Sequence, residues 1–126
     1  MIKGLGNDLI EIERIRKSIE RHEAHFLNRL FTKKEQDYCC QFKDPVPSFA
    51  GRFAAKEAIS KALGVGFGST LSWLDLEILN DSRGKPVVHF LDTAMKEFQN
   101  PVVLVSISHS KGHASAVAIW CDSMIP

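Results

Sequence analysis

The chain has 126 residues, of which 44% are hydrophobic and 25% are charged, a size and composition typical of a single globular domain. Its formal net charge of +1 gives no overall field that would attract a nucleic acid or a membrane surface. No apolar run approaches the roughly 20 residues needed to cross a bilayer, and the N-terminus lacks the pattern of a secretory signal. We therefore expect one domain over residues 1–126, with neither nucleic acid nor membrane as a partner.

The first half of the chain alternates strand and helix signals. Residues 2–10 are typical of a strand interrupted by Gly4 and Gly6, where glycine lets the backbone bend and leaves room for a ligand. A helix with one apolar stripe should follow. The stripe consists of Ile12, Ile15, Ile19, Phe26 and Leu30. Thr32 to Glu35 is a capping-box pattern that predicts a short helix to about residue 42. Ser48 can cap the next helix, which should end at Leu63.

The second half of the chain reads as strands and turns. Alternation predicts a strand over residues 74–78, a turn at 81–84 and a returning strand at 86–90. A short helix at 92–99 and two strands at 102–108 and 114–120 should follow. This order predicts an α+β fold, with a mainly antiparallel sheet packed against helices.

The three cysteines favour a reducing compartment. Cys39 and Cys40 are neighbours and Cys121 lies near the end of the chain, an odd count that does not suit a disulfide framework. We expect free thiols and a cytoplasmic location.

The helix over residues 48–63 carries the densest signal of chemistry. Glu57 and Lys61 are four residues apart and share a face, which is also the pattern of an ordinary exposed ion pair. Asp8, at the end of a strand, could join Glu57 as an oxygen ligand of Mg²⁺, which takes one or two protein carboxylates together with waters and phosphate oxygens. Alternatively, Asp8 is only an acid at the start of the next helix.

Two further features suit ligand or partner binding. His109 ends a strand, where it can either meet a ligand or serve as a polar group at the rim of the sheet. Arg14, Lys17 and Arg21 lie opposite the apolar stripe of their helix, so they form either a solvated face or a dock for an acidic helical partner.

Segments along nearly the whole chain together resemble the holo-acyl-carrier-protein synthase family of the 4′-phosphopantetheinyl transferase superfamily. Gly4-Leu5-Gly6-Asn7-Asp8-Leu9 and Phe31-Thr32-Lys33-Lys34-Glu35 carry the resemblance first. The most specific segment is Gly51-Arg52-Phe53-Ala54-Ala55-Lys56-Glu57-Ala58, continuing to Lys61-Ala62-Leu63-Gly64. Trp73 to Ile78, Gly84-Lys85-Pro86 and Val105 to His109 complete it.

The resemblance implies a homotrimer with each active site between two subunits. It implies Mg²⁺ bound through Asp8 and Glu57, with Lys61 at the phosphate and the reacting region. The residues expected to hold the co-substrate coenzyme A are Arg52, Lys61, Gly84, Lys85, Pro86 and His109. Arg14, with Lys17 and Arg21, would dock the apo acyl carrier protein.

The reaction implied is attack of a carrier serine on the β-phosphate of coenzyme A, with release of 3′,5′-ADP, in support of fatty acid biosynthesis. Either Glu57 or Asp8 accepts the serine proton, directly or through water. Two rival hypotheses use fewer of the segments. One is a Mg²⁺-dependent phosphodiesterase that needs no carrier protein, and the other is a non-catalytic module that binds carrier proteins through Arg14 and its neighbours.

Overall fold

A computed structural model describes residues 1–122, so the last four residues of the predicted domain 1–126 lie outside the described residues. The predicted α+β fold is confirmed, although its strands form two antiparallel sheets instead of one. The elements, in chain order, are β1 (Ile2–Glu11), α1 (Ile12–Leu30), α2 (Lys33–Cys39), α3 (Val46–Leu63), the 3₁₀ helix η1 (Trp73–Asp75), β2 (Leu76–Asn80), β3 (Pro86–Phe90), α4 (Asp92–Glu97), β4 (Val102–His109) and β5 (His113–Cys121).

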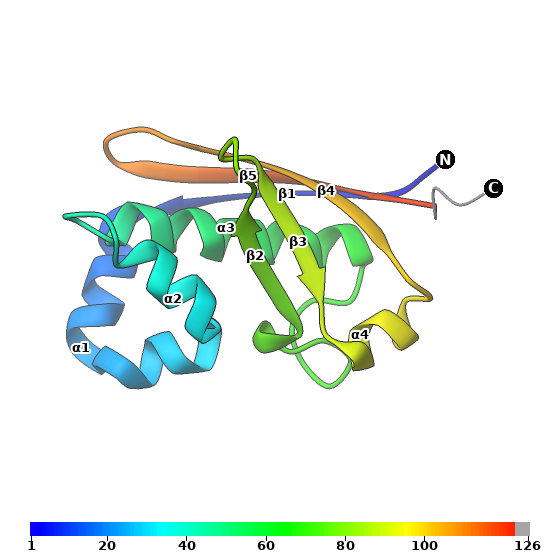
Figure 1. Ribbon diagram of the computed structural model, residues 1–126, viewed down its shortest axis with the longest axis horizontal. Helices are drawn as coiled ribbons and strands as arrows, with labels where there is room; N and C mark the ends of the chain where they lie inside the picture. Colours follow the sequence, from blue (N-terminus) through cyan, green and yellow to red (C-terminus); the bar gives the residue numbers. More distant parts are fainter. Residues whose placement is uncertain (123–126) are drawn as a thin grey trace.

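The larger sheet has the strand order β1-β5-β4, with α3 lying along one of its faces (Figure 1). Small residues line this contact on both sides. On β5 they are Ala114, Ala116 and Ala118, and on α3 they are Ala50, Ala54, Ala55, Ala58 and Ala62, all of them buried. Because small side chains let backbones approach closely, α3 and the sheet form a tightly packed central layer.

The two glycines of β1 serve this packing. A Cβ atom on Gly4 would lie 1.9 Å from the carbonyl oxygen of Ala62, and one on Gly6 would lie 2.0 Å from that of Ala58. The expectation that these glycines leave room for a ligand was therefore wrong, since helix α3 fills the space. Strand β1 nevertheless continues from Ile2 to Glu11, with an irregularity in its pairing to β5 between Ile2 and Gly4 and regular pairing past Gly6.

Other sequence predictions needed smaller corrections. Helix α3 begins at Val46 with Pro45 as its N-cap, so Ser48 lies inside the first turn and is not the cap. Residues 73–75 form η1, and β2 begins only at Leu76. The capping box at Thr32 and Glu35 is confirmed. Helix α1 is kinked at Glu23, whose φ of 49° is unusual for a residue other than glycine.

The opposite face of the larger sheet is covered by no described element. Strand residues alternate between faces, so Gly6 and Asp8 face α3 while Leu5 and Leu9 face away. Leu5 and Leu9 are each 67% exposed, and Leu104 of β4 is 52% exposed. The sheet thus presents a row of apolar side chains to its surroundings.

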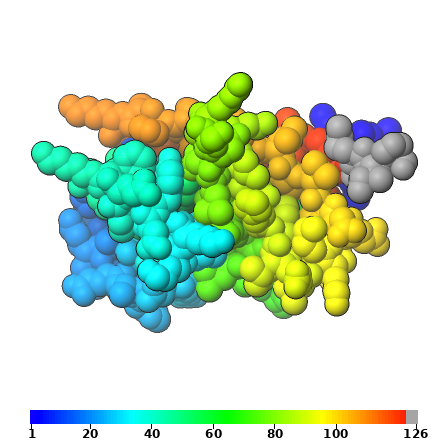
Figure 2. All heavy atoms as spheres, viewed as in Figure 1, coloured from blue at the N-terminus to red at the C-terminus, as the bar shows by residue number. Residues whose placement is uncertain are grey.

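The hairpin β2–β3 packs beside this core, with α1 and α2 on one side of it and α4 on the other (Figures 1 and 2). Within residues 1–122, no helix is long and apolar enough to cross a membrane. Cys39, Cys40 and Cys121 are all free thiols.

Candidate functional site

Asp8 and Lys61 come together across the contact between β1 and α3. The ammonium nitrogen of Lys61 lies 3.2 Å from Oδ1 of Asp8 and donates a hydrogen bond of 3.0 Å to the carbonyl oxygen of Asn7. Asp8 faces α3 because of its place in the strand alternation, and Lys61 reaches it from the last turn of the helix. The structure therefore joins two of the predicted residues that are 53 positions apart in the sequence.

Glu57 shares the face of α3 that carries Lys61, one turn earlier. Burial raises the pKa of the Glu57 carboxyl, the negative charge of Asp8 raises it further, and the positive charge of Lys61 opposes both effects. Asp8 is thus close enough to act on Glu57, and the lysine pairs with Asp8 instead of forming the simple helical pair with Glu57. Two carboxylates that interact at a partly open surface are a donor set that fits a Mg²⁺ ion.

A second group of predicted residues lines a cavity of about 450 Å³ beside the N-terminal half of α3. Arg52, Gly84, Pro86 and His109 all contribute to its wall, whereas Lys61 and Lys85 do not. The cavity lies between the connection from α2 to α3, the β2–β3 turn and the end of β4.

Arg52 is buried and held in place by several partners. It donates from Nε to the carbonyl oxygen of Ile78 at 3.1 Å and from Nη1 to Oγ of Ser48 at 3.2 Å, and it also bonds Asn80. Its guanidinium lies 4.3 Å from the centre of the Tyr38 ring. Because a guanidinium carries five N–H donors, Arg52 keeps donors free while forming a fixed part of the cavity wall.

Sequence reasoning missed the aromatic part of this cavity. Tyr38 and Phe42 both line it, with ring centroids 5.5 Å apart. Their spacing of four residues next to a helix is a usable signal, but the same spacing occurs wherever an aromatic pair simply packs. Only the fold shows that these rings share a cavity with Arg52 and His109.

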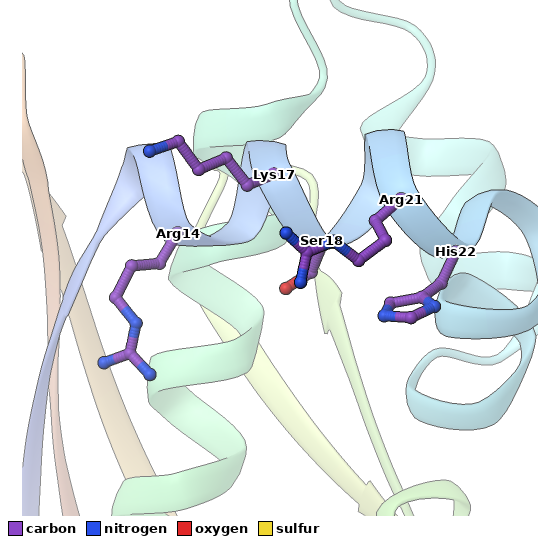
Figure 3. Close-up of a pocket in the computed structure, with 5 residues that line it drawn as sticks. All are labelled: Arg14, Lys17, Ser18, Arg21 and His22. Carbon is purple, nitrogen blue, oxygen red and sulfur yellow. The ribbon is translucent and has the colours of Figure 1, made fainter.

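The basic face of α1 forms a shallow cavity of about 210 Å³. Arg14, Lys17 and Arg21 line it together with Ser18 and His22, as Figure 3 shows. The prediction that the three cations share one face of the helix is therefore confirmed.

A second cavity, of about 290 Å³, continues from His22 along the same helix. It adds His25 and Arg29 to the basic surface, and Phe26 and Trp73 supply apolar walls. Sequence reasoning gave His25 and Arg29 no role, because they lie beyond the kink at Glu23 and the helix was expected to be straight, whereas Phe26 had been placed in the apolar stripe.

Helix α3 separates the carboxylate group from the cavity within one chain. Asp8 of β1 and Ile107 of β4 are both paired in register with Ala116 of β5, so they lie at the same level on opposite edges of the sheet. Ile107 lines the cavity and packs near Gly51 of α3, while Asp8 meets Lys61 of the same helix. The predicted site residues thus form two groups on two sides of α3.

Residues 4–118 match the family described as the 4′-phosphopantetheinyl transferase superfamily, so the chain belongs to this superfamily. A holo-[acyl-carrier-protein] synthase of Protochlamydia amoebophila is 53% identical over 120 residues, which cover 95% of this chain and 98% of the relative. The corresponding protein of Chlorobium limicola is 48% identical and covers 91% and 90%. Within the superfamily, the chain is a member of the holo-acyl-carrier-protein synthase family.

Solved structures of the same family share the fold. The Helicobacter pylori holo-[acyl-carrier-protein] synthase in complex with coenzyme A has a TM-score of 0.85 and 38% identity, covering 93% of this chain and 99% of that one. The Neisseria meningitidis enzyme has a TM-score of 0.89 and 31% identity, covering 97% and 100%.

Proposed function

We infer that this chain transfers the 4′-phosphopantetheine group of coenzyme A to a serine of apo acyl carrier protein, giving the holo carrier and 3′,5′-ADP. Its membership of the holo-acyl-carrier-protein synthase family over nearly the whole chain carries this inference. The similarity to an enzyme solved in complex with coenzyme A supports the choice of phosphopantetheine donor. The carrier and coenzyme A are the substrates of a cytoplasmic enzyme that supports fatty acid biosynthesis.

Asp8 and Glu57 are the proposed ligands of Mg²⁺. Among residues 1–122 there is no cluster of three or more potential metal ligands, and two carboxylates suit an ion that fills its other positions with water and phosphate oxygens. The negative charge of Asp8, which raises the pKa of Glu57, also supports the pairing, because a bound cation relieves such repulsion. When bound, the ion would neutralise charge on the pyrophosphate of coenzyme A.

The side chains around this site supply the rest of the chemistry. The serine oxygen forms a bond to the β-phosphorus, the bond from that phosphorus to the bridging oxygen breaks, and 3′,5′-ADP leaves. Lys61 stabilises the negative charge that develops on the phosphate oxygens. Asp8 or Glu57 accepts the serine proton, directly or through water.

The cavity beside Arg52 is the proposed binding site for the nucleotide end of coenzyme A. Aromatic rings and a buried guanidinium suit a base and its phosphates, respectively. Gly84 and Pro86 line the cavity at the β2–β3 turn, and Lys85 lies between them at the surface. His109 would bind from the end of β4. Lys61 would contact the same molecule at its pyrophosphate.

A homotrimer would unite the two groups of site residues. Since α3 separates the carboxylates from the Arg52 cavity in one chain, a neighbouring copy can bring its own cavity to them. The exposed apolar face of the sheet, including Leu5, Leu9 and Leu104, supports burial against other copies. Mixing inactive Glu57→Gln chains with inactive His109→Ala chains should restore part of the activity, whereas sites confined to one chain would stay inactive.

The basic face of α1 is the proposed dock for the carrier protein. Arg14, Lys17 and Arg21 offer positive charge to an acidic helix, and the adjoining cavity extends the surface to Arg29. Replacing both Arg14 and Arg21 with alanine should raise the KM for the carrier by about tenfold. This increase in KM should be smaller at high salt, because salt screens the charges. The KM for coenzyme A should stay unchanged. Lys33→Ala, on α2 outside these cavities, is the matched control.

Intact-mass spectrometry of an apo carrier protein tests the proposed function directly. The carrier should gain one phosphopantetheine mass with coenzyme A and Mg²⁺, and none when EDTA is added. Glu57→Gln should lower turnover by at least about a hundredfold with folding intact. Release of 3′,5′-ADP without a carrier would favour a phosphodiesterase, and activity that survives loss of Asp8 and Glu57 would favour a binding module.

A further inference from the structure

A second lysine of α3, Lys56, directly precedes Glu57 but points into the interior. Its ammonium nitrogen lies 2.8 Å from Oε1 of Glu35 on α2, and the side chains of both residues are 0% exposed. Burial lowers the pKa of Lys56, and the charge of Glu35 opposes that change. The pair therefore lies entirely inside the protein, next to a residue of the proposed metal site.

The ammonium group of Lys56 reaches three separate elements. Besides Glu35 it donates to the carbonyl oxygen of Leu30, at the end of α1, over 2.7 Å. It also donates to the carbonyl oxygen of Trp73, in η1, over 3.0 Å. Because an ammonium has three N–H donors, each donor is committed to a different element.

The carboxylate of Glu35 extends the same network. Its Oε1 also accepts from the backbone N–H of Thr32 at 2.8 Å, and its Oε2 accepts from that of Ile78 in β2 at 2.8 Å. Every buried side-chain nitrogen and oxygen among residues 1–122 has a hydrogen-bond partner. The network is thus complete, and it joins α1, α2, η1 and β2 to α3.

Stability alone does not account for such a pair. Two charges lose their hydration on burial, and well-packed apolar residues of similar volume often stabilise a fold equally well. Apolar contacts, unlike hydrogen bonds, have no preferred direction. The bonds of Lys56 run from α3 to α1, α2 and η1, so they oppose a rotation of α3 about its axis, and Glu57 is the next residue on that helix.

Small rotations of α3 would matter for the site. A side-chain carboxylate lies about 6 Å from the axis of its helix, so a rotation of about 20° moves it by about 2 Å. A displacement of about 1 Å can already cost a hundredfold in rate. In the proposed site Glu57 and Asp8 hold one ion, and Asp8 belongs to a different element, so the placement of Glu57 depends on the rotation of α3 relative to β1.

We propose that Lys56 and Glu35 are positioning residues that hold α3 at the rotation in which Glu57 faces Asp8. One of these bonds also holds the C-terminal end of α1, beyond the kink at Glu23, against α3. This proposal rests on the role of Glu57 given above.

The test replaces both charges with uncharged groups of similar shape, in the variant Lys56→Met/Glu35→Gln. At a temperature where circular dichroism shows a folded protein, kcat should fall by about tenfold or more. The KM for coenzyme A should stay within about twofold, since the Arg52 cavity does not contain either residue. Calorimetric titration of Mg²⁺ in the presence of coenzyme A should give a Kd raised by about tenfold.

Two further variants keep the test decisive. Glu35→Gln alone retains an acceptor for Lys56, and should show the same changes to a smaller degree if the double variant does not fold. Val46→Ala removes core volume at the far end of α3 and should lower the Tm without changing kcat or the Kd for Mg²⁺. Wild-type kcat and Mg²⁺ affinity in the folded double variant would overturn the proposal, as would an equal loss of kcat in Val46→Ala.

Glu57→Gln separates this proposal from the one on which it rests. Full activity of Glu57→Gln would remove Glu57 from the site, and with it the reason for positioning α3. If Glu57→Gln is impaired while the folded Lys56→Met/Glu35→Gln variant is not, only the positioning role fails.

Discussion

Two lysines of α3, five residues apart in the sequence, each pair with a carboxylate from another part of the chain, yet their surroundings differ. The side chains of Lys56 and Glu35 are both 0% exposed, whereas Lys61 is 53% exposed and its partner Asp8 is 16% exposed. The buried pair has the shorter separation, 2.8 Å against 3.2 Å.

Because only one of the two ion pairs is open to solvent, only the lysine of that pair can change its partner. In the proposed function the ammonium of Lys61 exchanges Asp8 for a phosphate oxygen of coenzyme A, and its exposure to solvent allows this exchange. Lys56 can exchange nothing, because all its donors are committed inside the protein. Helix α3 thus carries one lysine, Lys61, that is open to a substrate and another, Lys56, that has a structural role.

Replacing Lys56 alone should give the largest effect on stability. Lys56→Met leaves the carboxylate of Glu35 buried without its cation, a change that typically costs about 3–5 kcal/mol. For a domain of this size we expect the Tm to fall by more than about 10 °C. Thermal unfolding followed by circular dichroism measures it. A decrease in Tm as small as that expected on removal of an exposed ion pair would contradict the distinction between the buried and the exposed pair.

Replacing Lys61 should have the opposite effect, with a large loss of activity and little change in stability. Lys61→Met should lower kcat by about a hundredfold, because one cation that stabilises developing charge is lost. The free energy of unfolding should change by less than about 1 kcal/mol, since the pair is partly exposed. Steady-state kinetics and thermal unfolding of the same preparation give both numbers. Lys61→Arg, which keeps the charge, should recover part of the activity.

The exposed ion pair between Arg16 of α1 and Asp44, in the connection from α2 to α3, supplies the smallest expected effect, with a defined pH dependence. The hydrogen bond from Arg16 lowers the pKa of Asp44, and the backbone N–H of Val46 lowers it further. A depressed acid pKa adds stability above the ordinary value of about 3.9, and this contribution disappears as the pH falls through the depressed value.

Asp44→Asn should therefore lower the Tm slightly above about pH 5, and the difference from the wild type should vanish in strong acid. Unfolding curves recorded from pH 2 to 8 test this sign. Glu13→Gln, which alters the other acidic partner of Arg16, is the matched control. A difference that grows toward low pH would contradict the assignment.

Local patterns predicted most elements of the fold. The capping box at Thr32 gave the start of α2, and the alternation after residue 74 gave the β2–β3 hairpin to within two residues. The kink at Glu23 was not predictable in this way, because no proline or glycine marks it. The same holds for the N-cap of α3, where Pro45 is used although Ser48 has the stronger local preference.

In the candidate site, too, local sequence patterns predicted some features and only the fold decided the others. The spacing of Glu57 and Lys61 placed both on one face of α3, and the position of Asp8 at a strand end made it a candidate metal ligand beside Glu57. No spacing rule joins Asp8 to Lys61, because their meeting depends on how closely α3 packs on β1. That approach in turn requires the missing side chains of Gly4 and Gly6.

The sequence by itself determined the helices and strands, the family, and the residue types available for chemistry, because these depend on near neighbours and on motifs read along the chain. The tertiary structure decided which lysine reaches solvent, which carboxylate each lysine meets, and that α3 divides the site residues into two groups. The physical reason is that burial and ion pairing depend on packing between segments far apart in sequence, where a helix rotation of a few tens of degrees exchanges an interior position for an exposed one.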